Sequence, residues 1–284
     1  MPLVKFTKMQ GCGNDYVYFD CTADPDLIPH PAKTAVKLSD RHFGIGGDGI
    51  ILIMPSKLAD YRMWMFNADG SESEMCGNGI RCVARYLCDH DYFSGDEVRI
   101  ETGAGVKTIR INREKGHFVS ARVDMGEPIL EGLKVPVNLD LPEVVNQRIV
   151  LPGGGRSYYM TCVSMGNPHC VIFTDKITDE QVLQDGPQLE NHAMFPRRAN
   201  IEFVKVRNRH EVDMRVWERG TGETLACGTG ASAVGVACVL NRHTDRNVTV
   251  HLLGGDLQIE WSEVDNHVFM TGPATVVCTG TVEV

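Results

Sequence analysis

Two stretches of the chain share one pattern: Phe66-Asn67-Ala68-Asp69-Gly70-Ser71-Glu72-Ser73-Glu74-Met75-Cys76-Gly77-Asn78-Gly79 and Trp217-Glu218-Arg219-Gly220-Thr221-Gly222-Glu223-Thr224-Leu225-Ala226-Cys227-Gly228-Thr229-Gly230. Each enters a Cys-Gly-x-Gly turn, and an apolar helical segment follows each turn. Cys227 stands 151 positions after Cys76. Because self-similarity at a fixed interval is typical of a repeated architecture, the two stretches predict a duplicated fold.

Shorter anchors recur in the same order in both halves. They pair Gly49 with Asn200, Gly103 with Gly254, and Gly13-Asn14-Asp15 with Gly166-Asn167-Pro168. An apolar strand follows each Gly-Asn anchor, Tyr16–Phe19 in the first half and Cys170–Phe173 in the second. Identity between the halves is low elsewhere, so the prediction of a duplication depends on order and spacing.

The two predicted helices differ in how far they are apolar. The helix after Cys76 has an apolar stripe at helical spacing, formed by Ile80, Val83, Ala84, Leu87 and Cys88. The helix after Cys227 is apolar on all sides, which is typical of a helix enclosed by a sheet. We therefore predict an α/β (α+β) fold of two pseudo-symmetric domains, each a curled, mainly antiparallel sheet around a central apolar helix.

The ends of the two repeats predict the domain boundaries. The first repeat closes at Val123–Gly126 and the second at Phe269–Gly272, which leaves Ala274–Val284 as a strand that returns to the first domain. The first domain would contain residues 1–124 and 273–284 with Cys76, and the second residues 125–272 with Cys227. The segment Met1–Met9 is predicted to be a short amphipathic strand.

Composition favours a globular protein that binds a small molecule. The chain has 284 residues, of which 43% are apolar and 23% charged, and a net charge of −9. This charge, without a cluster of Lys and Arg, argues against a nucleic-acid partner. No apolar run approaches the ~18 residues of a membrane helix, so we expect no membrane partner and a cytoplasmic location.

Ten cysteines raise the question of metal or disulfide bonds. No two of them have the Cys-x-x-Cys spacing of a zinc or thioredoxin motif, so no metal site is predicted. Cys82, Cys88 and Cys238 lie on apolar helix positions and are interpreted as core residues. Cys12, between two glycines, is assigned no role.

Gly44-Ile45-Gly46-Gly47-Asp48-Gly49 has the form of a dinucleotide-binding loop. Such a loop requires a strand before it and a helix after it. Here a helical stretch, Ala32–Arg41, comes first and the strand Ile50–Met54 follows. The segment is therefore interpreted as a turn, and a nicotinamide site is not expected.

Cys76 and Cys227 each precede a glycine-containing turn that opens a helix. Free backbone N–H groups and the positive end of the helix dipole lower a thiol pKa and bind a carboxylate. A thiolate on one face of a carbon and a thiol on the other can remove and return a proton, which inverts the centre. The pattern predicts cofactor-independent inversion of an amino acid, without metal or pyridoxal phosphate.

Asn167-Pro168-His169-Cys170 allows two interpretations of His169. A lone histidine is most often structural, and no second ligand cluster with metal spacing accompanies it. However, His169 follows directly on the Asn167 anchor of the repeat, which favours a functional role. Both interpretations stay open at this point.

The quoted segments closely resemble the diaminopimelate epimerase family over essentially the whole chain. Asn67–Ser71, Cys76–Arg81, Met165–Cys170 and Glu218–Gly230 carry the resemblance. It implies conversion of LL-2,6-diaminopimelate to the meso form, in lysine and peptidoglycan biosynthesis, with no cofactor. We also expect a homodimer, although the sequence itself does not establish the oligomeric state.

The resemblance also implies roles for individual residues. Cys76 and Cys227 would be the catalytic acid/base pair, and His169 and Glu218 would influence the thiol pKa values. The implied substrate-binding residues are Asn14, Asn67, Gly77, Asn78, Asn167, Asn200, Glu218, Arg219, Gly228 and Thr229. Some family members have a ligand-contacting glutamine where this chain has Gly49, so that contact is absent here.

Two further classes of function stay open. Proline racemase-like and hydroxyproline epimerase-like enzymes of the same fold also use paired cysteines, but Arg219, Asn167 and Asn200 favour a substrate with a second carboxylate. A redox sensor based on two cysteines belongs to a different class and would consume thiols with peroxide without changing optical rotation. A pure binding module would not exchange a ligand's Cα proton with solvent.

Overall fold

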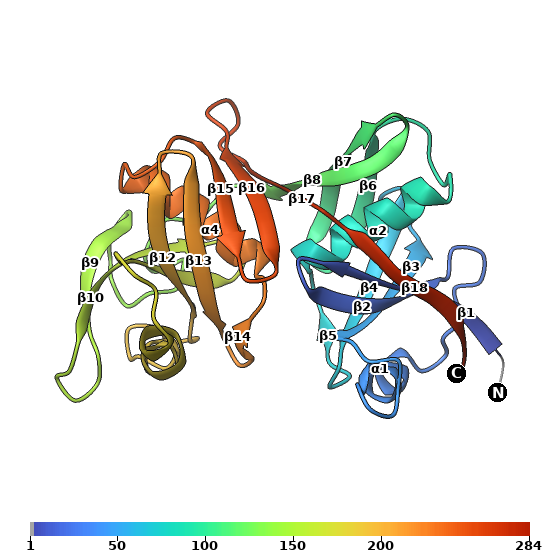
Figure 1. Cartoon of the computed structure of the whole chain (residues 1–284), viewed down its shortest axis with the longest axis horizontal. Coiled ribbons are helices and arrows are strands. Elements are labelled where there is room, and N and C mark those ends of the chain that lie inside the picture. The colour runs from blue at the N-terminus through green and yellow to red at the C-terminus, as the bar shows by residue number, and fades with distance from the viewer. Residues whose placement is uncertain (1–2) are drawn as a thin grey trace. The chain divides into compact units, whose positions relative to one another are not determined.

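The computed structural model describes residues 3–284, and the chain forms two compact units (Figure 1). Unit 1 comprises the chain up to Val123 together with Thr271–Val284, and unit 2 comprises Asp124–Met270. The expected domains divided after residues 124 and 272. The predicted start of the first strand at Met1 lies outside the described residues.

Unit 1 is a sheet with two helices. Its strands are β1 (Leu3–Gly11), β2 (Asn14–Asp20), β3 (Gly49–Pro55), β4 (Tyr61–Asn67), β5 (Glu72–Ser73), β6 (Glu97–Thr102), β7 (Gly105–Glu114), β8 (His117–Gly126, which runs past the unit boundary) and β18 (Thr275–Glu283). The helices are α1 (Pro31–Ser39) and α2 (Gly77–Asp89). All neighbouring strands described here pair antiparallel except β2 with β3 and β4 with β6, which are parallel.

Unit 2 repeats this arrangement. Its strands are β9 (Val144–Val150), β10 (Ser157–Ser164), β11 (Pro168–Phe173), β12 (Asn200–Asn208), β13 (Glu211–Glu218), β14 (Gly222–Thr224), β15 (Asn247–Leu252), β16 (Gly255–Trp261) and β17 (Val268–Gly272). Its helices are the π-helix η1 (Glu180–Asp185), α3 (Gly186–Glu190) and α4 (Gly228–Leu240). Its parallel pairs are β11 with β12 and β13 with β15, which correspond to β2 with β3 and β4 with β6 in unit 1.

The register of the parallel pairs defines equivalent positions in the two units. Tyr16 lies opposite Gly49 in unit 1, and His169 lies opposite Asn200 in unit 2. The predicted pairing of Gly49 with Asn200 is confirmed, since each is the first residue of its strand. The mixed α/β fold, dominated by sheet and with an apolar helix in each unit, is also confirmed.

The C-terminal strand returns to unit 1, as expected. Strand β18 pairs antiparallel with β1 along its length, from Leu3 opposite Glu283 to Gln10 opposite Thr275 (Figure 1). The chain's last strand therefore occupies the place in unit 1 that β9 occupies beside β10 in unit 2.

Helix α1 is shifted from its predicted limits of Ala32–Arg41. It begins at Pro31, where the fixed φ of proline suits a first helical turn and its missing N–H costs nothing. It ends before Asp40, whose backbone is extended and whose carboxylate accepts hydrogen bonds from the N–H groups of His42 and Phe43, both at 2.7 Å. This local hydrogen bonding competes with continuation of the helix.

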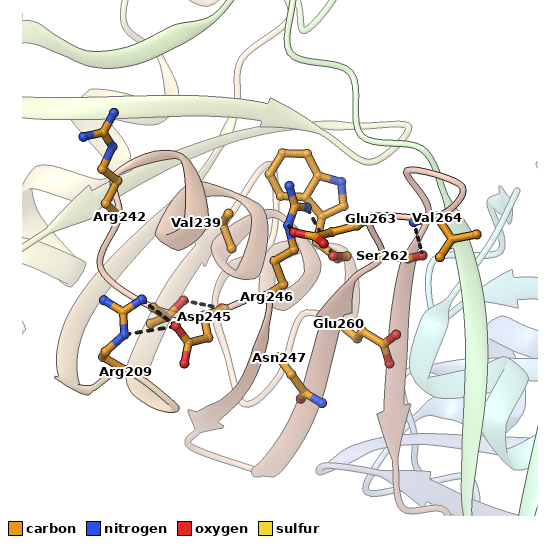
Figure 2. A pocket seen from close by; sticks show the side chains of 12 residues that line it. Arg209, Val239, Arg242, Asp245, Arg246, Asn247, Glu260, Ser262, Glu263 and Val264 are labelled. Carbon is orange, nitrogen blue, oxygen red and sulfur yellow. Dashed lines mark hydrogen bonds and ion pairs between the residues drawn. The ribbon is translucent and has the colours of Figure 1, made fainter.

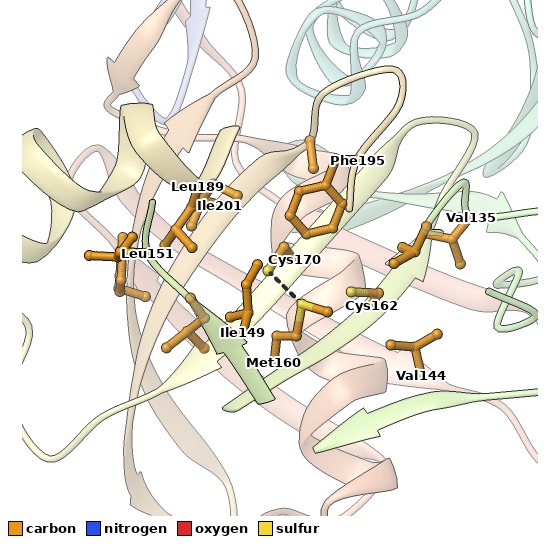
Figure 3. Packing of buried hydrophobic residues seen from close by; sticks show 14 of the residues in the cluster. Val135, Val144, Ile149, Leu151, Met160, Cys162, Cys170, Leu189, Phe195 and Ile201 are labelled. Atoms are coloured by element: carbon orange, nitrogen blue, oxygen red, sulfur yellow. Dashed lines mark hydrogen bonds between the residues drawn. The ribbon is translucent and has the colours of Figure 1, made fainter. Parts of the chain in front are cut away.

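The core of unit 2 surrounds α4. The helix contacts strands β10, β11, β12, β15 and β16, and its apolar side chains up to Cys238 are buried, which explains why it lacks a polar face. A separate cluster of buried side chains joins β9 to β12 to Val182 of η1 and Leu189 of α3, and in it the sulfur atoms of Cys170 and Met160 lie 3.8 Å apart (Figure 3). Cys82, Cys88 and Cys238 are buried helix residues, as expected.

No helix among residues 3–284 is long and apolar enough to cross a membrane.

Candidate active site

Cys76 occupies the N-cap of α2. Its backbone is extended, and its sulfur accepts a hydrogen bond from the Gly79 N–H at 3.3 Å. The N-terminal N–H groups of a helix lack partners within the helix, and a cap atom satisfies one of them. Gly79 has no room for a side chain, because a Cβ would lie 2.7 Å from the Cδ1 atom of Ile51. The sulfur is thus held against the first turn of the helix.

Asn14 connects this thiol to a buried turn. Cys76 Sγ donates to Asn14 Oδ1 at 3.1 Å, and Asn14 Nδ2 donates to Asp48 Oδ2 at 2.6 Å. The same carboxylate oxygen accepts from the backbone N–H of Asp15 at 3.1 Å. The segment Gly44–Gly49 therefore ends in a turn that fixes Asn14, in agreement with its interpretation as a turn rather than a nucleotide loop.

Tyr16 is a further neighbour of Cys76. Its hydroxyl lies within hydrogen-bonding reach of Asn14 and Cys76. Burial raises the pKa of the Tyr16 phenol far above 10.0, and the charges of Cys76 and Asp48 raise it further. The phenol therefore remains a neutral hydrogen-bond donor at any working pH.

The other predicted residues of unit 1 differ in their surroundings. Gly77 and Asn78 are the first two residues of α2, and Asn78 Nδ2 lies 3.5 Å from Asn14 Oδ1. Asn67 ends β4, and its Nδ2 donates to Ser71 Oγ at 3.0 Å. The structure therefore brings Asn14, Asn78 and Cys76 together, whereas the Asn67 side chain contacts Ser71 in a local turn.

Cys227 occupies the N-cap of α4 in the same way. Its sulfur accepts from the Gly230 N–H at 3.4 Å and lies 3.5 Å from the hydroxyl of Thr229. A Cβ on Gly230 would lie 2.9 Å from Glu202 Oε1 and 3.0 Å from the methyl group of Met214. Gly228 and Thr229 are the first two residues of α4 and follow directly on Cys227.

The expected low pKa is wrong for Cys227. Burial raises the pKa of this thiol well above 9.0, and the charges of Glu218 and Glu202 raise it further. Hydrogen bonds from Thr229 and the Gly230 N–H act in the opposite direction but are weaker. The physical reason is that a helix N-terminus contributes only a partial charge, whereas two nearby carboxylates contribute whole charges at a site shielded from water.

Glu218 is the carboxylate that contacts Cys227. It is hydrogen-bonded by the Cys227 thiol and by the hydroxyl of Thr224 at 2.5 Å. Burial raises the pKa of Glu218, while these hydrogen bonds and the nearby His169 lower it. Glu218 and Cys227 thus form a pair in which the charge of either group opposes ionisation of the other.

Asn200 and Arg219 are linked to each other through the backbone. Asn200 is buried, its Nδ2 donates to the Pro168 carbonyl at 3.1 Å, and its Oδ1 accepts from the Arg219 N–H at 2.9 Å. The Arg219 guanidinium donates to the Arg197 carbonyl at 3.0 Å. Asn200 therefore positions the backbone that carries Arg219.

His169 is fully buried and lies between two acceptors. Its Nδ1 is 2.6 Å from Glu202 Oε1, and its Nε2 is 3.0 Å from Asn167 Oδ1. Asn167 Nδ2 in turn donates to Thr229 Oγ1 at 3.3 Å. His169 thus takes part in a hydrogen-bonded group that reaches the first turn of α4.

Three residues beside the thiols were missed by the sequence reasoning: Tyr16, Asp48 and Glu202. Two signals could have found Tyr16 and Glu202. Tyr16 and His169 both stand two positions after the Gly-Asn anchors, and Glu202 is the one charged residue within the apolar run Ile201–Val204. A charge inside a buried strand requires a partner, and here that partner is His169.

Gly49 cannot carry a side chain in this backbone. A Cβ there would lie 2.1 Å from the Phe66 carbonyl oxygen and 2.9 Å from the Tyr16 ring. The absence of a side chain at this position is thus required by the close approach of β3 to β4.

A pocket elsewhere in unit 2 has a different character (Figure 2). Two of the arginines that line it are paired: Arg209 Nε donates to Asp245 at 3.0 Å, and Arg246 Nε lies 2.8 Å from Glu263. The guanidinium of Arg246 also stacks over Trp261. Within residues 3–284, no group of three or more His, Cys, Asp or Glu side chains is arranged to hold a metal ion.

Comparison with known proteins extends over the whole chain. The sequence model of the family described as diaminopimelate epimerase matches residues 6–131 and 161–277. The diaminopimelate epimerase of Agathobacter rectalis is 51% identical, and the match covers 99% of this chain and 100% of that protein. The diaminopimelate epimerase of Desulfovibrio desulfuricans is 53% identical over 98% of this chain and 97% of that protein.

Solved structures show the same fold at low sequence identity. A PhzF-family phenazine biosynthesis protein from Bacillus anthracis superposes with a TM-score of 0.70 at 17% identity, and the match covers both chains completely. A hydroxyproline epimerase from Agrobacterium vitis also gives 0.70, at 13% identity, over 99% of this chain and 91% of that one. With both thiols at equivalent helix N-caps and relatives at about half identity along its full length, this chain belongs to the diaminopimelate epimerase family.

Proposed function

We propose that this protein is an isomerase that interconverts LL-2,6-diaminopimelate and meso-diaminopimelate with two cysteines and no cofactor. The observation that carries the proposal is the equivalence of Cys76 and Cys227, since Cys76 is the N-cap of α2, which follows β5, and Cys227 is the N-cap of α4, which follows β14. Family membership supplies the substrate, and with it a place in lysine and peptidoglycan biosynthesis.

The proposed reaction is a proton transfer across one carbon. One sulfur, as thiolate, accepts the proton of the substrate Cα, and the electron pair left behind is delocalised into the adjacent carboxylate. The other sulfur, as thiol, donates its proton to the opposite face of that carbon. The reverse reaction exchanges the two roles, so each turnover leaves the thiolate on the other cysteine.

The helix N-termini support the charge that forms on the substrate. The N–H groups of Gly77, Asn78, Gly228 and Thr229 lie in the first turns of α2 and α4, where they have no partner within the helix. Such donors bind a carboxylate and stabilise it most when its charge increases. We assign the reacting carboxylate to them.

The remaining predicted residues would recognise the rest of the substrate. Arg219 offers a guanidinium for the distal carboxylate. Glu218 and the asparagines Asn14, Asn67, Asn167 and Asn200 would bind the ammonium groups or position residues that do. His169 and Glu218 would adjust the pKa of Cys227, since Glu218 accepts its hydrogen bond and His169 lowers the pKa of Glu218.

The partner we propose is thus a small molecule, with no nucleic acid and no membrane. We further propose a homodimer in the cytoplasm, which sedimentation of the purified protein and fractionation of its source cells would test.

Purified protein with LL-diaminopimelate tests the function. Chiral chromatography should show the meso isomer, and in deuterium oxide the product should gain one deuterium at the inverted carbon. Proline and 4-hydroxyproline serve as parallel substrates, because a neighbour of the same fold is a hydroxyproline epimerase. Inversion of either of these without reaction of diaminopimelate would overturn the proposed substrate.

A further inference from the structure

A continuous group of hydrogen bonds leads from a buried carboxylate to the Cys227 thiol. Glu202 Oε1 lies 2.6 Å from His169 Nδ1, and His169 Nε2 lies 3.0 Å from Asn167 Oδ1. Asn167 Nδ2 lies 3.3 Å from Thr229 Oγ1, which is 3.5 Å from Cys227 Sγ. All five residues belong to unit 2, on β11, β12, α4 and the residues that precede them.

The donors and acceptors fix the direction of this chain of hydrogen bonds. An amide oxygen only accepts, so His169 Nε2 must carry a proton toward Asn167. The Asn167 amide nitrogen only donates, so it occupies a lone pair of the Thr229 hydroxyl and leaves the hydroxyl proton free to point elsewhere. The sulfur of Cys227 is within its reach, so the chain ends in a donor aimed at that sulfur.

Glu202 does not stabilise the fold in a way that would account for its burial. It is 0% exposed, and its second oxygen, Oε2, has no hydrogen-bond partner among the residues that the structure describes. A buried carboxylate with an unsatisfied oxygen destabilises a fold relative to an apolar residue of similar size. Its presence within the buried run Ile201–Val204 therefore points to a role in the site.

Unit 1 lacks the equivalent arrangement. Ile51 is the third residue of β3, as Glu202 is of β12, and its Cδ1 atom lies against Gly79 as Glu202 Oε1 lies against Gly230. Asn14 presents its oxygen to Cys76 and donates to Asp48, the opposite orientation to that of Asn167. Cys76 is thus an internal reference for any effect that passes through Glu202.

We propose that Glu202 is a positioning residue for Cys227: it fixes His169, and through it Asn167 and Thr229, so that the Thr229 hydroxyl donates to the sulfur when the thiolate forms. The inference rests on the proposed role of Cys227 as a base. It adds Glu202 to the site as a residue that acts on the Cys227 sulfur through other side chains, and it does so in unit 2 alone.

Other groups that face Cys227 must be separated from this effect. They come from each element packed around it: Glu218 on β13, Glu202 on β12, His169 on β11, and Thr229 with the Gly230 N–H on α4. Glu202 acts in two opposing senses, because its charge disfavours the thiolate whereas the hydrogen-bond chain that it fixes favours it. A single variant that lacks the Glu202 charge therefore cannot separate the effect of the charge from the effect of the hydrogen-bond chain.

Two substitutions distinguish them. Glu202→Gln removes the charge but keeps a group that can donate to His169 Nδ1, which preserves the direction of the chain. Glu202→Met removes the charge and the hydrogen bond, and fills a similar volume. Any difference between the two variants therefore measures the hydrogen-bond chain and not the charge.

The readout is the rate at which iodoacetamide labels Cys227 and Cys76, followed by peptide mass spectrometry across a range of pH. Because only the thiolate reacts, the rate reports the ionised fraction. We expect Cys227 to be labelled about tenfold faster in Glu202→Gln than in Glu202→Met, the effect of one hydrogen bond to a charged group. Cys76 should be labelled at equal rates in both. Equal rates at Cys227 would overturn the proposal.

Thr229→Val provides a second measurement that does not need the methionine variant to fold. It removes the last hydroxyl of the hydrogen-bond chain, so a second change at the neutral residue before it should no longer affect the sulfur through that hydroxyl. The labelling rate of Cys227 in Thr229→Val should match that in Thr229→Val combined with Asn167→Ala. Additive losses would show that the residues act independently and would refute the chain. Neither measurement uses diaminopimelate, so failure here is distinct from failure of the proposed substrate.

Discussion

Tyr16 and His169 occupy equivalent positions in the two units: each lies opposite the first residue of the strand that runs parallel to its own. One backbone position thus places a neutral phenol beside Cys76 and an imidazole paired with a carboxylate near Cys227. The two thiols have equivalent positions but different chemical surroundings. The groups that act on the ionisation of Cys227 therefore differ from those that act on Cys76.

Replacement of either thiol should abolish epimerisation. Cys76→Ala or Cys227→Ala removes the acid in one direction and the base in the other, so we expect a loss of at least about a thousandfold in kcat. Cys238→Ala is the matched control, because Cys238 is a buried thiol of the same helix as Gly228 and lies in the core. Substantial activity in Cys76→Ala would contradict the two-thiol mechanism.

Asp48→Ala should impair unit 1 without unfolding it. Asp48 Oδ2 accepts from both Asn14 Nδ2 and the Asp15 N–H, so its loss frees the Asn14 amide to rotate. We expect kcat to fall about tenfold, as for a misplaced positioning group, with little change in the urea midpoint. Asp96→Ala, which breaks a surface ion pair with Arg113, should leave kcat unchanged. A normal kcat in Asp48→Ala would show that Asp48 does not position Asn14.

Gly49→Ala should destabilise unit 1. The added Cβ would lie 2.1 Å from the Phe66 carbonyl oxygen, which the pairing of β3 with β4 holds in place. We expect a loss of about 3 kcal/mol in the free energy of unfolding, the upper range for overpacking. Gly95→Ala meets nothing within 4 Å, and at its φ of +96° it should cost only about 1 kcal/mol. Urea unfolding measures the free energy of unfolding of both variants. Equal losses in Gly49→Ala and Gly95→Ala would be inconsistent with the close approach of β3 to β4.

The free energy of unfolding should fall in alkaline solution because buried thiols must ionise. Burial raises the pKa of the Cys238 thiol from 9.0 to about 12. The folded state therefore holds this proton more tightly than the unfolded chain, so its contribution is complete below pH 9.0 and is lost as pH rises toward about 12.

Urea unfolding at a series of alkaline pH values measures this contribution. Cys238→Ala should flatten the decline by about 1.4 kcal/mol per pH unit within that window. Cys278 is an exposed thiol, so Cys278→Ala should leave the slope as it is. If Cys238→Ala and Cys278→Ala gave identical slopes, another group would control the alkaline transition.

Removal of metal ions should not affect the reaction. Two thiols supply the acid and the base, and helix N–H groups supply the anion site, so the proposed chemistry assigns no step to a metal. Activity after exhaustive dialysis against a chelator should equal that of untreated protein. A loss that added zinc restores would contradict this prediction.

The fold could be predicted because its signals are periodic and repeated. The apolar stripe from Ile80 to Cys88 and the Cys-Gly-x-Gly turns determine helices by spacing alone, and the order of anchors determines the arrangement of strands. The limits of α1 were harder to predict, because Asp40 ends the helix with its own side-chain hydrogen bonds. Such local competition does not change the hydrophobic pattern.

The site was predictable where side chains lie beside the repeated turns, as for Cys76, Asn78, Cys227 and Thr229. It was not predictable where contacts join distant segments, as between Asn14 and Asp48 or His169 and Glu202. The pKa of Cys227 was wrongly predicted for the same reason. The helix N-terminus is visible in the sequence, but the proximity of Glu202 and Glu218 follows from the sheet.

The pairing of β1 with β18 affects the order in which the two units can fold. Unit 2 is built from one uninterrupted segment, Asp124–Met270, whereas unit 1 needs β18, which follows unit 2 in the sequence. During synthesis, all of unit 2 is therefore made before β1 can pair with β18. Until then β1 has an unpaired edge. At this stage of synthesis, unit 1 is therefore open to aggregation or to binding by a chaperone.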